Sequence, residues 1–230
     1  MSARSQDFVS AKILSAQGAV RIVRLEPSQN VMTDVPVAAG TQLRAGDVIK
    51  TETGGLIVLG LSDGSQAVIA SKTTVEIKDL SGSPRTIFNV LRGKTRIQIQ
   101  KMGGRPNPYR VTTPTTVIAV RGTIFDVFVK GARTDVFVTE GEVGVAGLTV
   151  SEREVILTPG QFTFVEGNRP PAAPKRFRLN RNDEFFRPVS ENGGNVRQGA
   201  DDNRNGVDQD TRNGDKTRGG GRSGNGRKSN

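Results

Sequence analysis

The stretch Thr116–Val129, TVIAVRGTIFDVFV, decides the fold class. Its two halves are Thr116–Val120 and Phe125–Val129, which are apolar at successive positions apart from Asp126. Both faces of each segment are therefore expected to be buried. β-Branched and aromatic side chains of this kind suit pleated, half-buried surfaces. We therefore expect these segments to be central strands of a fold with two packed β layers.

The chain around this stretch alternates short apolar segments with turn signals, and no segment has the period of a helix. In Arg96–Lys101, Ile97 and Ile99 point to one face of a strand and the polar residues between them to the other. This pattern predicts a strand covered on one face only, with Arg96 on the uncovered face. The turn candidates are Gln17-Gly18, Ala39-Gly40, Gly54-Gly55, Asp63-Gly64, Ser81-Gly82, Arg92-Gly93, Gly103-Gly104, Lys130-Gly131, Glu140-Gly141 and Pro159-Gly160.

These patterns predict one all-β domain at residues 8–166, a two-layer β-sandwich or roll, or a solenoid-like stack, after a flexible N-terminus at 1–7. Residues 167–187 begin with a Pro-rich linker and continue into a segment whose Phe177, Leu179, Phe185 and Phe186 could dock on the domain. Residues 188–230 are mostly Gly, Asn, Asp, Arg, Ser and Gln, which predicts a disordered C-terminal tail.

The composition excludes most catalytic chemistry. The chain has neither Cys nor His, so it lacks the commonest zinc ligands, the commonest general base and every Ser-His or Cys-His arrangement. Glu140 and Glu142 flank a predicted turn, where exposed Glu is ordinary. Ser71 and Lys72 are neighbours on an expected strand and would point to opposite faces. We therefore expect no enzyme, no cofactor and no metal site.

The formal net charge of +10 is concentrated in two places. Residues 84–110 carry seven basic residues and no acidic one, and the chain from Arg212 onward carries six basic residues against one Asp. Such runs are usually solvated surface, but the first could bind a polyanion or another partner. The candidate face consists of Arg85, Arg92, Lys94, Arg96, Lys101, Arg105 and Arg110.

Three further motifs carry weak signals. Arg92-Gly93-Lys94-Thr95 is similar to the end of a P-loop, but an alternating strand follows it instead of a helix, so a hairpin turn is the expectation. Asp201–Asp210 has part of the order of a calcium loop, yet Arg212 occupies its twelfth position. Arg218–Gly224 resembles RGG segments that bind nucleic acid, without their aromatic residues.

Taken in order, several blocks of this chain resemble the FecR domain family. The strongest is Val120–Val127, VRGTIFDV, which is similar to the family's Gly-Thr-x-Phe element. The glycines of these blocks suit turns and Phe125 suits a core position, so the blocks indicate architecture and not catalysis. The other blocks are Leu43–Thr51, Leu61–Ser65, Leu91–Gly93, Tyr109–Pro114, Val138–Val143 and Leu157–Gln161.

The resemblance implies an all-β domain on the outer side of the bacterial inner membrane. In the regulators that name the family, this domain passes a surface signal to a sigma factor through a membrane helix. This sequence shows no anti-sigma segment, no membrane helix and no apolar signal-peptide core. We therefore expect a stand-alone module that is periplasmic or secreted, with the cytoplasm as the alternative.

Two functions remain open. The first is a non-catalytic interaction module of the cell envelope, in signal sensing, which binds a protein or glycan through an exposed strand edge or the candidate face. The second is a binder of polyanions or nucleic acid, which works through the basic residues at 85–110 and the Arg/Gly tail. The sequence names no partner and no oligomeric state.

Overall fold

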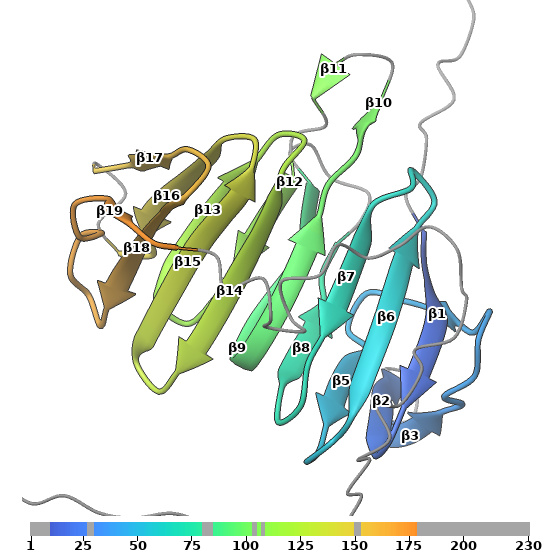
Figure 1. Ribbon diagram of the computed structural model, residues 1–230. Helices are drawn as coiled ribbons and strands as arrows, with labels where there is room; N and C mark the ends of the chain where they lie inside the picture. Colours follow the sequence, from blue (N-terminus) through green and yellow to red (C-terminus); the bar gives the residue numbers. More distant parts are fainter. Residues whose placement is uncertain are drawn as a thin grey trace, which may run out of the picture. The chain divides into compact units, whose positions relative to one another are not determined.

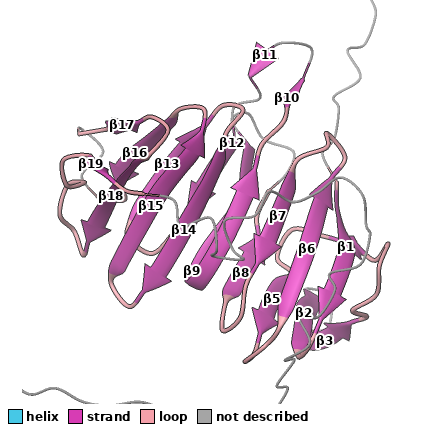
Figure 2. Cartoon of the chain, viewed as in Figure 1, coloured by secondary structure: helices cyan, strands magenta, loops and turns pink. Residues whose placement is uncertain are grey.

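The computed structural model describes residues 10–26, 30–79, 85–102, 105–106, 109–149 and 153–178. These residues form strands and turns, and no helix occurs among them (Figure 2). Seventeen of the strands join into one sheet, which folds into two facing layers (Figure 1). The predicted all-β fold with two layers is confirmed.

The first layer, called layer A, faces the viewer in Figure 1. All its strand pairs are antiparallel, and the second half of the long strand β9 (Arg85–Gln98) lies near its middle. In spatial order its strands are β4 (Gln42–Leu43), β1 (Ala11–Gln17), β6 (Leu56–Leu61), β7 (Gln66–Ile69), β9, β14 (Ile124–Lys130), β15 (Arg133–Glu140), β18 (Gln161–Glu166) and β19 (Lys175–Arg176).

The second layer, called layer B, lies behind layer A and contains the first half of β9. Its pairs are antiparallel except for β9 with β12, which is parallel. Its strands are, in order, β3 (Val31–Val35), β2 (Val20–Glu26), β5 (Val48–Thr51), β8 (Thr74–Ile77), β9, β12 (Tyr109–Thr112), β13 (Thr116–Val120), β16 (Val143–Gly147) and β17 (Val155–Leu157). A separate hairpin pairs β10 (Lys101–Met102) with β11 (Arg105–Pro106).

The hydrophobic core lies between the layers and consists mostly of β-branched and leucine side chains. β13 and β14, the strands of the stretch Thr116–Val129, each have a neighbour on both sides, as predicted. They belong to different layers, however, because the chain crosses between layers at Arg121–Thr123. Phe125 is fully buried, which confirms its predicted core position.

The two layers are joined within β9. Its first half pairs with β8 and β12 in layer B, and its second half pairs with β7 and β14 in layer A. The pairing with β8 slips by one residue at Leu91, and Gly93 follows with a φ of 92°. The strand therefore bends at a bulge and continues. The predicted hairpin turn at Arg92-Gly93 is wrong, because both residues lie inside one strand.

In several of the blocks that resemble the FecR family, a carboxylate accepts hydrogen bonds that stabilise a turn. Asp47 is fully buried, and its carboxylate accepts hydrogen bonds from Arg24 Nε at 2.6 Å, Arg24 Nη2 at 2.7 Å and the backbone N–H of Arg44 at 2.8 Å. The hydrogen bond to Asp47 raises the pKa of Arg24 above its ordinary value. The Asp63 carboxylate accepts hydrogen bonds from the Ser65 N–H and the Tyr109 hydroxyl. These carboxylates therefore stabilise the architecture.

The described part of the segment 167–187 lies against layer A. Lys175 and Arg176 pair with β18, and the Phe177 ring contacts the rings of Phe137 and Phe162 at centroid distances of 5.2 and 6.4 Å. The other residues predicted to dock, Leu179, Phe185 and Phe186, lie outside the described residues, as do the N-terminus at 1–7 and the predicted disordered tail at 188–230.

The bend in β9 yields a stability prediction. A Cβ atom at position 93 would lie 2.3 Å from Thr73 Oγ1, whereas one at Gly131, which has a φ of 58°, would meet nothing within 4 Å. Gly93→Ala should lower the free energy of unfolding by about 2–4 kcal/mol, from backbone strain plus overlap, and Gly131→Ala by about 1 kcal/mol. Urea denaturation followed by circular dichroism measures both. Equal losses would contradict the role given to the bend.

Candidate functional site

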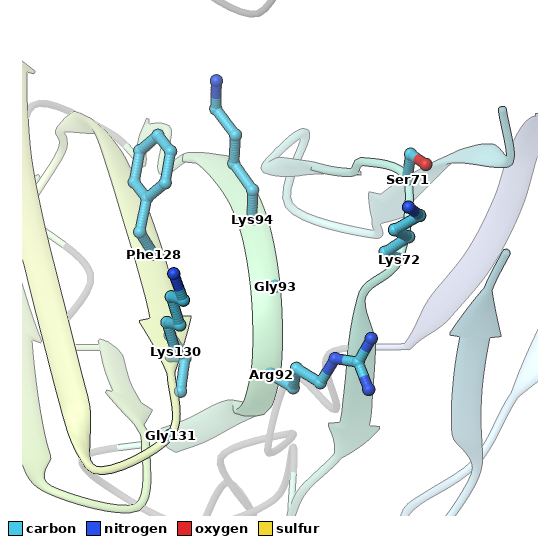
Figure 3. A pocket seen from close by; sticks show the side chains of 9 residues that line it. Ser71, Lys72, Arg92, Gly93, Lys94, Phe128, Lys130 and Gly131 are labelled. Carbon is cyan, nitrogen blue, oxygen red and sulfur yellow. The ribbon is translucent and has the colours of Figure 1, made fainter. Parts of the chain in front are cut away.

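A shallow cleft of about 470 Å³ lies where β9 leaves layer A. Three segments line it: the turn between β7 and β8, the bend of β9, and the end of β14 with the turn that follows. Figure 3 shows their side chains around one opening. We call this surface the basic cleft, and its lining residues are Ser71, Lys72, Arg92, Gly93, Lys94, Phe128, Val129, Lys130 and Gly131.

The lining carries four cationic side chains and no carboxylate. Lys72, Arg92 and Lys130 are exposed, and none of them makes an ion pair with another described residue. Lys94 is half-buried, and its Nζ lies 4.6 Å from the centroid of the Phe128 ring. The cleft lining therefore gathers positively charged side chains from three segments of the chain.

The turn that carries Lys72 is fixed by hydrogen bonds. Ser71 Oγ donates to the carbonyl of Glu52 at 3.1 Å and accepts the N–H of Gly54 at 3.1 Å. The N–H of Thr73 donates to Thr51 Oγ1 at 3.0 Å. Between these anchors Lys72 has a φ of 57°, in the left-handed region that usually takes Gly or Asn.

The structure brings only part of the predicted face to the basic cleft. Arg92 and Lys94 line it. Lys101 lies against Gly122, and Arg110 is exposed on β12 of layer B, so neither is among the lining residues. The side chains of Arg85 and Arg105 lie outside what the structure describes.

Arg96 was predicted on the uncovered face of its strand, and this prediction is wrong. The residue is 3% exposed, and Asp126, directly opposite on β14, is fully buried. Arg96 Nε and Nη2 donate to the two carboxylate oxygens of Asp126, each at 2.8 Å. This bidentate pair neutralises the guanidinium charge, which makes its burial tolerable.

Sequence reasoning missed Lys72, Lys130 and Phe128. They come from two other segments, and only the pairing of β14 with β9 and the turn before β8 place them beside Arg92. One signal was present: Lys130 directly precedes Gly131, which the sequence predicts in a turn. A basic residue beside a turn glycine stands at the end of a strand, where the charges of separate strands can meet.

No alternative chemistry gains support from the described residues. Ser71 and Lys72 lie in a turn and not on a strand, and the hydroxyl of Ser71 is engaged by backbone groups. Glu140 and Glu142 are exposed around Gly141. Within the described part of the chain, no three His, Cys, Asp or Glu side chains gather in a way that could hold a metal ion. The calcium-like loop and the RGG-like segment lie outside it.

A protein-family model described as "FecR protein" matches residues 47–144. Residues 47–144 form a FecR domain. The match begins at the buried Asp47 and contains the bend of β9, the Gly-Thr-x-Phe element and all nine residues that line the basic cleft. The block Leu157–Gln161 lies beyond the matched residues.

Among curated proteins, none matches this chain. Two solved structures resemble it, both of a "putative anti-sigma factor" from Parabacteroides distasonis, at 1.65 and 2.50 Å resolution. Each is 20% identical, with a TM-score of 0.47 over 56% of this chain, and this chain spans 59% of each. Nothing about function follows from a likeness of this size. No helix among the described residues is long and apolar enough to cross a membrane.

The contribution of the Arg96–Asp126 ion pair to stability can be tested by replacing one or both of its residues. Arg96→Ala should lower the free energy of unfolding by about 3–5 kcal/mol, because it leaves the buried Asp126 carboxylate without its guanidinium. The double variant Arg96→Met with Asp126→Leu should lose less than this single variant, since no charge is then buried. Urea denaturation provides the values.

Arg21 provides the matched control, because it pairs with Asp34 while both side chains stay about two-thirds exposed, at 70% and 67%. Arg21→Ala should leave the unfolding midpoint unchanged within error. If Arg96→Ala also left the unfolding midpoint unchanged, the Arg96–Asp126 ion pair would contribute nothing to the stability of the fold.

Proposed function

We propose that this protein is a non-catalytic interaction module of the bacterial cell envelope, which binds a protein or glycan partner in signal sensing. The FecR domain at residues 47–144 is the observation that carries the proposal. FecR domains are extracytoplasmic in their family, which favours a periplasmic or secreted protein over the cytoplasmic alternative.

The chemistry of the described residues supports a binding role over catalysis. Asp47 and Asp126 are fully buried, and each is engaged by an arginine, while Asp63 binds a tyrosine hydroxyl. These carboxylates are occupied in holding the fold. Proton transfer to a substrate would need an acid or base that reaches it.

Two surfaces are available for a partner. The basic cleft suits a ligand with negative charge. At the other surface, β3 pairs with β2 alone among the described strands, and Val31 and Met32 on β3 are 48% and 56% exposed. A free strand edge of this kind can pair with an extended segment of another protein.

Cell fractionation tests the location. The native gene, expressed with all of its upstream coding sequence, should yield a protein that blots in the periplasm or medium, beside a periplasmic and a cytosolic marker. Recovery only with the cytosolic marker would overturn the envelope proposal and favour the alternative function.

That alternative is polyanion or nucleic-acid binding, and the lining of the basic cleft, with four cationic residues and no carboxylate, is the observation that favours it. Fluorescence anisotropy with a single-stranded oligonucleotide tests it. If four phosphates are neutralised, affinity should fall about 50-fold between about 50 and about 200 mM salt. The envelope proposal predicts no saturable binding at the higher salt concentration, and tight binding there would contradict it.

A further inference from the structure

We propose that the outer face of layer A is a docking surface for a segment of this same chain, residues 179–187. This interaction goes beyond the proposed function, because it assigns an occupant from within the chain to one face of the domain. Three observations support it: a buried ion pair that points away from the core, a row of aromatic rings beside that pair, and the place where the described chain ends.

The ion pair of Arg96 and Asp126 points away from the core between the layers. The residues that follow these two, Ile97 and Val127, are fully buried in the core. Because successive side chains of a strand point to opposite faces, Arg96 and Asp126 stand on the outer face of layer A. Their side chains are nevertheless only 4% and 0% exposed. A pair on an outer face stays partly in water unless a further segment covers it.

A second ion pair on the same face shows how far the cover extends. Arg133 and Asp135 also point outward from layer A, since Thr134 between them is buried and hydrogen-bonds to Thr113 of the region next to β12 in layer B. Their side chains remain 42% and 22% exposed. The cover is therefore local: it lies over the middle strands β9 and β14 and leaves this end of β15 in water.

A row of aromatic rings leads from the edge of layer A to the buried pair. Phe162 on β18, Phe137 on β15 and Phe128 on β14 belong to adjacent strands (Figure 1). The Phe137 ring stacks on Phe162 at a centroid distance of 5.0 Å and meets Phe128 edge-on at 5.4 Å. Phe137 also lies directly opposite Asp126. A contiguous aromatic surface of this kind packs well against other aromatic and aliphatic side chains.

The described part of the chain ends beside this row. The ring of Phe177 contacts Phe137 and Phe162, and Arg178 after it is the last described residue. The nine residues 179–187 span up to about 30 Å when extended. Crossing from β18 over β15 and β14 to β9 takes three strand spacings, about 14 Å in all. Residues 179–187 are therefore long enough to reach the ion pair.

The sequence of residues 179–187, LNRNDEFFR, suits this surface. Leu179, Phe185 and Phe186 offer apolar side chains that can pack on the row, and the chain beyond them contains no further aromatic residue. The segment is also tethered at the edge of the face by β19 and Phe177. Tethering gives it an effective concentration on the order of millimolar, which a separate protein must exceed to take its place.

Paramagnetic relaxation in the full chain tests this docking. The chain contains no Cys, so Asn182→Cys creates a single site for a nitroxide label. The label should broaden the amide signals of β9, β14 and β15 strongly and those of β2, β3 and β5 in layer B much less, because the effect falls steeply with distance. Equal broadening of both layers, or broadening centred on layer B, would overturn the proposal.

Two controls identify the occupant. A label at Gln209→Cys, far along the tail, should broaden β9 and β14 no more than the strands of layer B. Spin-labelled Asn182→Cys chains at natural isotope abundance are also mixed with isotope-labelled wild-type chains. Strong broadening of β9 and β14 in the wild-type chains would show that a second copy supplies the segment, and docking within one chain would be wrong.

Coupling to the ion pair gives an independent test. With Phe185→Ser and Phe186→Ser together, the segment loses side chains that hold it, and the Asp126 carboxylate gains contact with water. Arg96→Ala should then lower the urea midpoint by about half or less of its effect in the otherwise unchanged chain, since an unpaired carboxylate costs less in water than in a buried site.

Val189→Ser with Val196→Ser provides the matched background, because it removes two apolar side chains that lie beyond the segment. In this background Arg96→Ala should lower the urea midpoint as much as in the unchanged chain. An equal effect of Arg96→Ala in all three backgrounds would show that residues 179–187 do not cover the ion pair, which would refute the proposal.

Discussion

The bend of β9 at Leu91–Gly93 is the constraint on which the rest of this structure depends. One strand supplies pairing edges to both layers, so the core between them forms only if the chain turns from one layer to the other at this point. Thr73 stands so close to Gly93 that no side chain fits there. The Thr73 hydroxyl accepts the N–H of Lys94 at 2.9 Å, which fixes the strand directly after the bend. A hydrophobic core thus depends on one residue that lacks a side chain.

The basic cleft follows from the same constraint. Where β9 leaves layer A, the turn before β8 and the end of β14 border the departing strand, and their side chains surround the space beside it. The hydrogen bonds that shape the turn at Ser71–Thr73 also hold Lys72 at the rim. Fold and candidate site therefore share residues: Thr73 positions the bend, and its neighbour Lys72 presents a charge. A ligand in the cleft would contact all three segments at the junction of the two layers.

The sequence predicted the fold class because strand alternation and turn glycines are local signals. Gly18, Gly64 and Gly141 were predicted in turns, and each has a positive φ. Residue pairs that are distant in the chain were not predictable in this way. Arg96 follows the alternation of an exposed position, and only its partner thirty residues later explains why it is buried.

The residues of the candidate site were likewise predictable only where the signal is local in the sequence. A run of basic residues between 84 and 110 was visible in the sequence, and it led to Arg92 and Lys94 but also to Arg96, whose charge is already neutralised. Lys72 and Lys130 stand outside that run, so a window of sequence could not include them. Gly93 was read as a hairpin turn because a glycine after a basic residue looks the same at a turn and at a bulge. A turn and a bulge are distinguished by the strands that pair with the residues on either side of the glycine, and those strands are distant in the sequence.

The most direct test of this account is amide hydrogen exchange in the full chain, compared between the wild type, Gly93→Ala and Gly131→Ala. The account predicts that Gly93→Ala speeds exchange in both layers together, in the strands that pair with β9 on either side of the bend, whereas Gly131→Ala speeds exchange only near its own turn. Faster exchange in Gly93→Ala that is confined to the residues beside position 93 would contradict it.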